Sequence, residues 1–364
     1  MAFIAKISDE IIREIGMYFL DEKATLCALA LTQSRIYTAT RGLIFRKLEV
    51  WMQGSPIVGF HQTGQRLRIL ERYEKLMKIF EYQPELGNYT QVLVLGWGTN
   101  PVWLANNGAN ERATTFLRLT PNIRSLEIRN FSHQSEPFTP PPHLLHHLHL
   151  LQHVTTSDPR TKVHDVLQMM QLPDLQHLII RFMDVRARLI AQNITSAVDT
   201  AKHLNHLVLA PRTHLNFLAV TSLLSIASRL ESLSLNLPGL LYENAALGAQ
   251  RQRILEMVDD MSPASIRQCI QPLRETLVEL NLADAGVQWP GHDGTRLNLR
   301  DFECMKRLSV RAACLLVPNR AWGARDGLFK LLPKNIEEIN VSSTPMGSHD
   351  AFFHHLCKGL TICR

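Results

Sequence analysis

Histidine is the residue type whose spacing in this sequence most suggests chemistry. The chain has 16 histidines, and His147, His177 and His206 occupy the same position of a recurring apolar pattern, with His149 two residues after the first. If that pattern marks neighbouring strands, the three imidazoles lie about 4.8 Å apart. Such a row can hold a metal, attract an anion when protonated, or form ordinary polar surface. We expect a polar surface that contacts a partner, and no metal.

The remaining reactive residue types show no catalytic arrangement. The sequence has no phosphate-binding loop, HExxH motif, nucleophile elbow or CxxC pair. Its six cysteines have neither the paired spacing of zinc ligands nor the density of a disulfide framework, so we expect reduced thiols. The glycine segments at 96–98 and 291–294 are expected to be loops after strands. The sequence therefore predicts a protein that is not an enzyme and has no cofactor.

The composition indicates a folded protein and does not favour a nucleic-acid or membrane partner. A 45% hydrophobic and 20% charged content over 364 residues is typical of a folded chain. The formal net charge of +6 comes from scattered basic residues, which does not favour a nucleic-acid partner. There is no apolar signal core at the N-terminus and no apolar run of membrane-spanning length. We expect an intracellular protein, cytoplasmic or nuclear, with no membrane partner.

One short apolar pattern returns along most of the chain from about residue 86. It consists of an apolar residue, two variable positions, a second apolar residue, one variable position and a third apolar residue. A degenerate copy surrounds Leu93 and Leu95, and the clear copies are Ile123-Leu126-Ile128, Leu145-Leu148-Leu150, Leu175-Leu178-Ile180, Leu204-Leu207-Leu209, Leu230-Leu233-Leu235, Leu277-Leu280-Leu282, Met305-Leu308-Val310 and Ile336-Ile339-Val341.

This pattern predicts a short strand in each repeat. The last two apolar residues are two positions apart, so they point to the same face and enter a core together. Helical patterns between the copies, at 163–171, 214–228 and 323–332, can cover the other side of a parallel sheet. The sequence therefore predicts an α/β fold, a right-handed leucine-rich-repeat solenoid with strands lining its concave face. The expected outward, substrate-binding residues are His147, His149, His177, His206, Ser232, Ser234, Asn236, Glu279, Asn281, Arg307 and Arg311.

Two stretches depart from the repeat. The longest interval, after Leu233, contains two amphipathic patterns at 247–261 and 263–272, which we interpret as an inserted helical pair. The proline-rich stretch 132–143 is expected to be a loop, since proline interrupts helices and central strands.

Residues 7–50 predict three short helices. Ser8 can cap the first, and Ile11, Ile12, Ile15 and Phe19 define its apolar stripe. A module of this size buries its own apolar surface poorly, so either the repeats or a partner must cover it. A helical cap on the first repeat is one interpretation, because solenoids need protected ends.

The same residues resemble a known family. The segments ISDEIIREI from Ile7, FLD from Phe19, LCALAL from Leu26, RIY from Arg35 and LIFRKL from Leu43 are similar to a fungal F-box, and F-box proteins often carry C-terminal leucine-rich repeats. The resemblance implies an F-box at 1–50, a linker with an amphipathic helix at 51–85 and the repeats at 86–364. The sequence departs from the family pattern at Ile7-Ser8, where Leu-Pro is usual.

The family's activity follows from the resemblance alone. It implies a non-catalytic substrate receptor of a cullin-RING ubiquitin ligase of the SCF type, whose F-box binds a Skp-type adaptor and whose repeats bind an unidentified protein substrate. The alternative is a leucine-rich-repeat scaffold or inhibitor with a helical cap and no ubiquitin role. The adaptor contacts carried over from the family are Ile7, Ser8, Ile11, Ile12, Ile15, Leu20 and Leu29.

Overall fold

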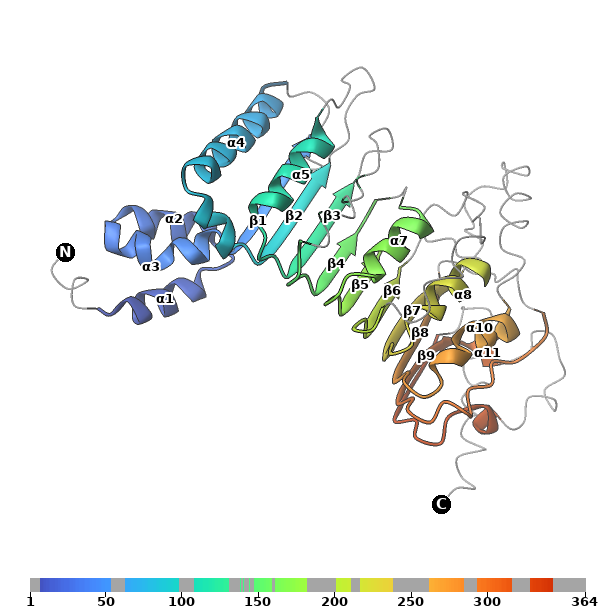
Figure 1. The fold of residues 1–364 in the computed structure, drawn as a ribbon. Helices are drawn as coiled ribbons and strands as arrows, with labels where there is room; N and C mark the ends of the chain where they lie inside the picture. Colours follow the sequence, from blue (N-terminus) through green and yellow to red (C-terminus); the bar gives the residue numbers. More distant parts are fainter. Residues whose placement is uncertain are drawn as a thin grey trace. The chain divides into compact units, whose positions relative to one another are not determined.

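The computed structural model shows two compact units, residues 1–158 and 159–364, which are described separately. Each unit is mixed α/β and contains parallel strands that follow one another in chain order (Figure 1). The structure describes residues 7–53, 63–97, 108–130, 138, 140, 144, 147–158, 161–181, 201–210, 217–237, 262–284, 293–315 and 328–342.

The first unit begins with three short helices, α1 (Asp9–Tyr18), α2 (Lys23–Leu31) and α3 (Ser34–Ile44). The hydroxyl of Ser8 caps α1 by accepting a hydrogen bond from the backbone N–H of Ile11 at 3.4 Å. A small core joins the helices, because Ile12, Ile36 and Ala39 are buried together, and Ile7 and Leu29 pack against them.

Where the structure describes the first unit, its sheet has four parallel strands, β1 (Lys47–Gln53), β2 (Val92–Trp97), β3 (Ser125–Asn130) and β4 (His153–Thr156). Helix α4 (Thr63–Tyr82), the 3-10 helix η2 (Pro84–Tyr89) and helix α5 (Ala109–Leu119) accompany them. Phe80 of α4 and Phe116 of α5 are fully buried, with ring centroids 6.1 Å apart, so both helices cover the same side of the sheet.

Two features of this sheet differ from the sequence prediction. Strand β1 was not expected, and it crosses the boundary that we placed at residue 50; it pairs with β2, so the sheet begins at Lys47 rather than near residue 86. The expected strand around Leu148 is wrong. Strand β4 lies further along the chain, where Val154 pairs with Leu126 and Leu148 is buried ahead of the strand.

The described residues of the second unit form six parallel strands in chain order: β5 (His177–Ile180), β6 (His206–Leu209), β7 (Ser232–Leu237), β8 (Glu279–Asp284), β9 (Arg307–Arg311) and β10 (Glu338–Ser342). The middle apolar residues of the predicted pattern are in register across these strands. Five of them are at most 2% exposed and form the core, namely Leu178, Leu207, Leu233, Leu280 and Leu308. The strand predictions for this unit are therefore confirmed.

The described helices of the second unit are α7 (Val163–Met170), α8 (Phe217–Ser225), α10 (Pro263–Ile270) and α11 (Ala312–Leu315), with 3-10 helices η4 (Gln271–Leu273) and η6 (Leu328–Leu331). Helices α7, α8 and α10 match predicted patterns. Ser262 caps α10 by accepting from the N–H of Ser265, with Pro263 in the first turn. The pattern at 247–261 and the first half of that at 323–332 lie outside the described residues, and η6 occupies the second half. No helix in the described part of the chain is long and apolar enough to cross a membrane.

Candidate functional site

Helix α1 presents two different apolar faces. Ile12 points into the three-helix core and is 4% exposed. Ile11, Ile15 and Tyr18, spaced four and three residues apart, share another face and are 49%, 41% and 87% exposed. Leu31, at the end of α2, is also 87% exposed. The exposed stripe of α1, defined as Ile11, Ile15 and Tyr18, is an apolar surface on a small helical module.

The other residues expected to contact the adaptor belong to the cap, the core or the half-buried parts of the helical module. Ser8 caps α1, while Ile7 and Leu29 pack against the buried core. Leu20 is half-buried after the end of α1. Only Ile11 and Ile15 among the seven carried-over residues therefore offer an exposed apolar side chain on α1. Sequence reasoning missed Tyr18, although its helical spacing from Ile11 and Ile15 was available as a signal.

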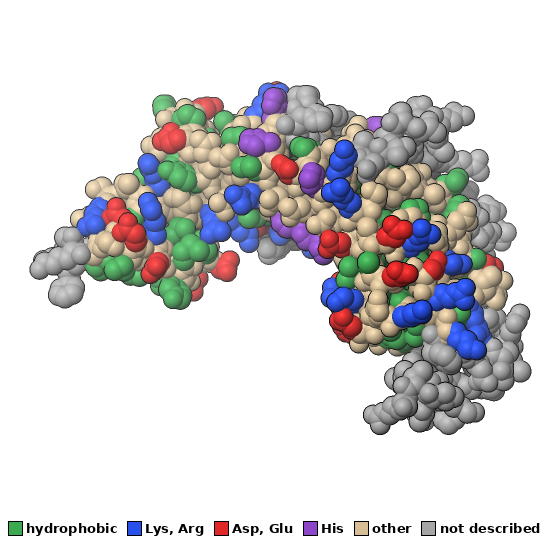
Figure 2. Space-filling view, turned by 60° about the horizontal axis from the view of Figure 1, so that its bottom comes forward, with side chains coloured by type: hydrophobic (Ala, Val, Ile, Leu, Met, Phe, Trp, Pro, Cys, Tyr) green, Lys and Arg blue, Asp and Glu red, His purple; other side chains and the backbone are tan. Residues whose placement is uncertain are grey.

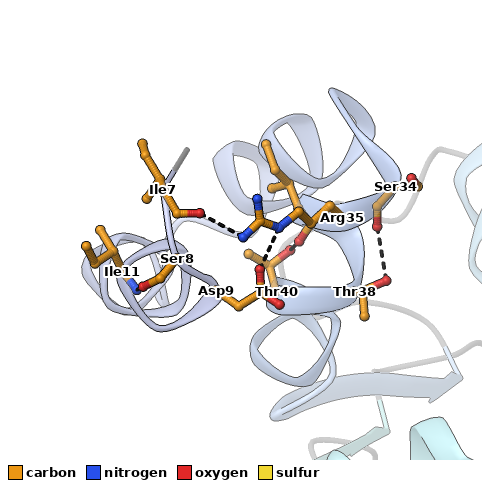
Figure 3. Close-up of polar contacts among 9 residues, drawn as sticks. Ile7, Ser8, Asp9, Ile11, Ser34, Arg35, Thr38 and Thr40 are labelled. Atoms are coloured by element: carbon orange, nitrogen blue, oxygen red, sulfur yellow. Dashed lines mark hydrogen bonds and ion pairs between the residues drawn. The ribbon is translucent and has the colours of Figure 1, made fainter. Parts of the chain in front are cut away.

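Arg35 fixes the start of α1 against α3 (Figure 3). Its Nε donates to Oδ1 of Asp9 at 2.8 Å, and its Nη2 donates to the backbone oxygen of Ile7, also at 2.8 Å. A guanidinium can hold two acceptors in one plane, which an ammonium cannot. These two bonds link Arg35 to residues 26 and 28 positions earlier in the chain. They therefore hold the start of α1 against α3 and fix the orientation of α1 within the three-helix module.

The sheet of the second unit presents two rows of outward side chains that alternate with the buried leucines. We call them the first and second rows. The first row is His177, His206, Ser232, Glu279, Arg307 and Glu338, in that order across the strands. The second row, two residues further along each strand, is Ile179, Val208, Ser234, Asn281, Ser309 and Asn340.

The β5 and β6 end of these rows combines imidazole and aliphatic groups. The rings of His177 and His206 are stacked, with centroids 4.2 Å apart and planes 5° from parallel. Ile179 and Val208 lie beside them in the second row, and all four residues are partly exposed. The row of histidines is therefore confirmed for this pair. No group of three or more potential metal ligands occurs among the described histidines, cysteines and carboxylates.

The β8 and β9 part of the first row carries charges that are already paired. Nη2 of Arg307 donates to Oε2 of Glu279 at 2.8 Å, and the hydroxyl of Ser232 donates to the same oxygen at 3.4 Å. The hydrogen bond to Glu279, followed by the attraction between the two charges, raises the pKa of Arg307 above its ordinary value. Acidic and basic side chains are also interspersed over the surface in Figure 2. This part of the face is not a free cationic patch.

Several expected site residues lie elsewhere. His147 and His149 are in exposed turns before β4, outside the strand rows, because the strand begins later than expected. Asn236 and Arg311, at 3% and 5% exposure, are buried near the ends of β7 and β9. Gly96 belongs to β2 rather than to a loop. Positions 98, 291 and 292 of the glycine segments lie outside the described residues.

Comparison with known proteins identifies no family for this chain. No protein-family model matches the chain, and no curated protein matches it. The crystal structure of a TLR13-ssRNA13 complex is similar over 74% of this chain and 38% of that chain, with 15% sequence identity and a TM-score of 0.32. The chain thus spans well under half the length of that structural neighbour.

Proposed function

We propose that this chain is a non-catalytic substrate receptor of a cullin-RING ubiquitin ligase. Helices α1 to α3 form an F-box that binds a Skp-type adaptor, and the parallel strands and helices form a leucine-rich-repeat solenoid whose strand face binds a protein substrate. The chemistry of ubiquitin transfer belongs to the other subunits.

The observation that carries the proposal is the exposed stripe of α1. The module has its own small core of Ile12, Ile36 and Ala39, yet it leaves Ile11, Ile15 and Tyr18 outside that core. Apolar groups spaced along one helix face are suited to insertion into a partner's groove. The F-box resemblance implies that the partner is a Skp-type adaptor. The exposed stripe of α1 would be the apolar surface that contacts it.

The strand face of the second unit supports the substrate-binding part of the proposal. Strand residues there present aliphatic, imidazole, hydroxyl, amide and paired charged groups in regular rows. A mixed surface of this kind can select a protein partner by shape and by hydrogen bonding as well as by charge. We place the substrate over β5 to β9, centred on the two rows.

A second function, a scaffold or inhibitor with a helical cap, is favoured by a different observation. The helices run directly into the sheet: the N–H groups of Gln91 and Val92 donate to the backbone oxygen of Arg46 at 2.8 and 3.0 Å. The hydroxyl of Thr90 also donates to the oxygen of Phe45 at 3.0 Å. These bonds tie the end of α3 to the first strands, as expected of a cap that protects the edge of a sheet.

A calorimetric titration of the full chain with purified Skp-type adaptor separates the two functions. The F-box proposal expects saturable binding with one adaptor per chain. The cap function expects no binding heat at adaptor concentrations up to the high micromolar range. A chain that stays folded and shows no adaptor binding would therefore rule out the ligase role and leave the scaffold.

A further inference from the structure

The second row on the strand face of the second unit changes character along the sheet. Ile179 on β5 and Val208 on β6 are aliphatic, whereas the positions that follow on β7 to β10 carry hydroxyl and amide groups. These four residues, in order across the strands, are Ser234, Asn281, Ser309 and Asn340. Every member of the row is at least partly exposed, and none carries a charge.

The hydroxyl and amide groups of this row have hydrogen-bonding capacity to spare. Within the part of the chain that the structure describes, the side chains of Ser234, Asn281, Ser309 and Asn340 make no hydrogen bond. Each amide offers two N–H donors and a carbonyl acceptor, and each hydroxyl offers one donor and an acceptor. A ligand can therefore bond to the row without breaking a contact that the fold already makes.

The charged side chains nearest to these groups interact with one another. In the first row, Nη2 of Arg307 donates to Oε2 of Glu279 at 2.8 Å, and Glu338 pairs with Arg307 in the strand register on its other side. Arg311, two residues after the β9 member of the second row, is 5% exposed. An incoming carboxylate would compete with Glu279 for Arg307, and an incoming ammonium would compete with Arg307 for the glutamates. Because a charged group also loses water on binding, the row is better suited to a neutral ligand.

The spacing of the amide groups matches an extended polypeptide. Neighbouring strands are about 4.8 Å apart, so the backbones of Asn281 on β8 and Asn340 on β10 lie roughly 9.6 Å apart. A polyproline II segment has three residues per turn and rises about 3.1 Å per residue, so equivalent backbone groups recur every ~9.3 Å. These groups make no hydrogen bonds within the segment and are free to bond to a side-chain amide. The backbone groups inside an α-helix already bond to one another and cannot use the row in this way.

We propose that the second row binds an extended, uncharged segment of a protein substrate that runs across the strands. Backbone amides of the segment bond to Asn281 and Asn340, and one of its aliphatic side chains packs on Ile179 and Val208. The distance from β5 to β10 is roughly 24 Å, which about eight residues in the polyproline II conformation span. This inference rests on the proposed substrate role of the strand face and does not depend on adaptor binding.

The test measures binding of fluorescent peptides to the full chain by anisotropy, with no adaptor present. The probe is a capped peptide that begins with leucine and continues with four proline-glutamine pairs. In three matched peptides the last two glutamines become glutamate, the same two become lysine, or every proline becomes glycine. We expect saturable binding of the neutral proline peptide with a dissociation constant of about 1 mM or lower. Each matched peptide should bind about threefold more weakly or worse.

Two variants locate the peptide on the row. Asn281→Ala together with Asn340→Ala removes both amides and should weaken binding of the neutral peptide about fivefold or more. Asn205→Ala removes a partly exposed amide ahead of β6 and outside both rows, and should bind the peptide as the wild type does.

Four results would each overturn the inference: no measurable binding of the neutral peptide, equal or tighter binding of a charged peptide, equal binding of the glycine peptide, or full binding by the double variant. Tighter binding of a charged peptide would leave the face with a substrate role but assign it a different substrate class. Adaptor binding is measured separately, so the ligase role and this inference can fail independently.

Discussion

The imidazole rings of His177 and His206 stack face to face across β5 and β6, with 4.2 Å between their centroids. They occupy paired positions of the strand register, so the stack follows from placing the same residue type at the same position of two neighbouring repeats. Both rings are partly exposed on the proposed substrate face.

The imidazole and aliphatic groups at this end should take part in binding a peptide ligand. A fluorescent peptide with glutamates flanking a leucine is suitable, because imidazole N–H groups can donate to carboxylates and Ile179 and Val208 can contact the leucine. His177→Gln with His206→Gln should weaken its binding roughly two- to fivefold, consistent with partly exposed polar contacts. His147→Gln, outside the rows, should bind as the wild type does; equal behaviour of the two variants would contradict the assignment.

The two apolar faces of α1 should respond differently to truncation. Ile12 is buried against Ile36 and Ala39, so Ile12→Ala should destabilise the helical module by about 2 to 4 kcal/mol. Ile11 is 49% exposed, and Ile11→Ala should change stability by less than about 0.5 kcal/mol. Hydrogen exchange of the α1 to α3 backbone amides measures both. Similar effects of the two substitutions would mean that α1 packs in a different orientation.

Asp301 should make the second unit sensitive to acid. Partial burial acts to raise the pKa of Asp301, but hydrogen bonds from Gln271 and Arg267, with the Arg267 charge, outweigh it and lower the pKa from 3.8. A lowered pKa in the folded state means that the carboxylate stabilises the fold above pH 4 and that this contribution is lost as the pH falls through the lowered value. The stability difference between wild type and Asp301→Asn should therefore shrink below about pH 4. A difference that stays constant from pH 6 to pH 3 would be inconsistent with this role.

The strands of the second unit could be predicted because each repeat places two core residues on the same face of its strand. Leu178 and Ile180, or Leu233 and Leu235, are two residues apart and are all at most 1% exposed. A buried parallel strand needs that spacing whatever surrounds it. The outward positions follow from the alternation, which is why the first row from His177 to Arg307 could be predicted by residue number. In the second row, Ser234 and Asn281 were predicted and Ile179, Val208 and Ser309 were not.

The predictions failed where another pattern overlapped the repeat. Leu148 and Leu151 are both buried, but the strand uses Val154 and a buried Thr156 in place of a third apolar residue. The β-branched run at 154–156 was the available signal. Strand β1 was missed because its alternating Leu48, Val50 and Met52 directly follow the helical module.

Exposure was harder to predict than strand position. Asn236 has the outward alternation of Ser232 and Ser234 but is 3% exposed near the end of β7. The alternation rule gives the face of a strand and does not include what packs over its end. On α1, Ile11 and Ile12 are adjacent in sequence yet 49% and 4% exposed, because adjacent residues on a helix point in different directions.

The most direct test of the central claim is adaptor binding by the full chain carrying Ile11→Asp and Ile15→Asp. Both positions are exposed, so the variant should remain folded, while two charges in an apolar contact should weaken adaptor binding at least about a hundredfold. Arg13→Asp, also exposed on α1 but on a different side, is the matched control and should bind as the wild type does. A folded double variant that binds adaptor with wild-type affinity would contradict the assignment of this stripe as an F-box surface.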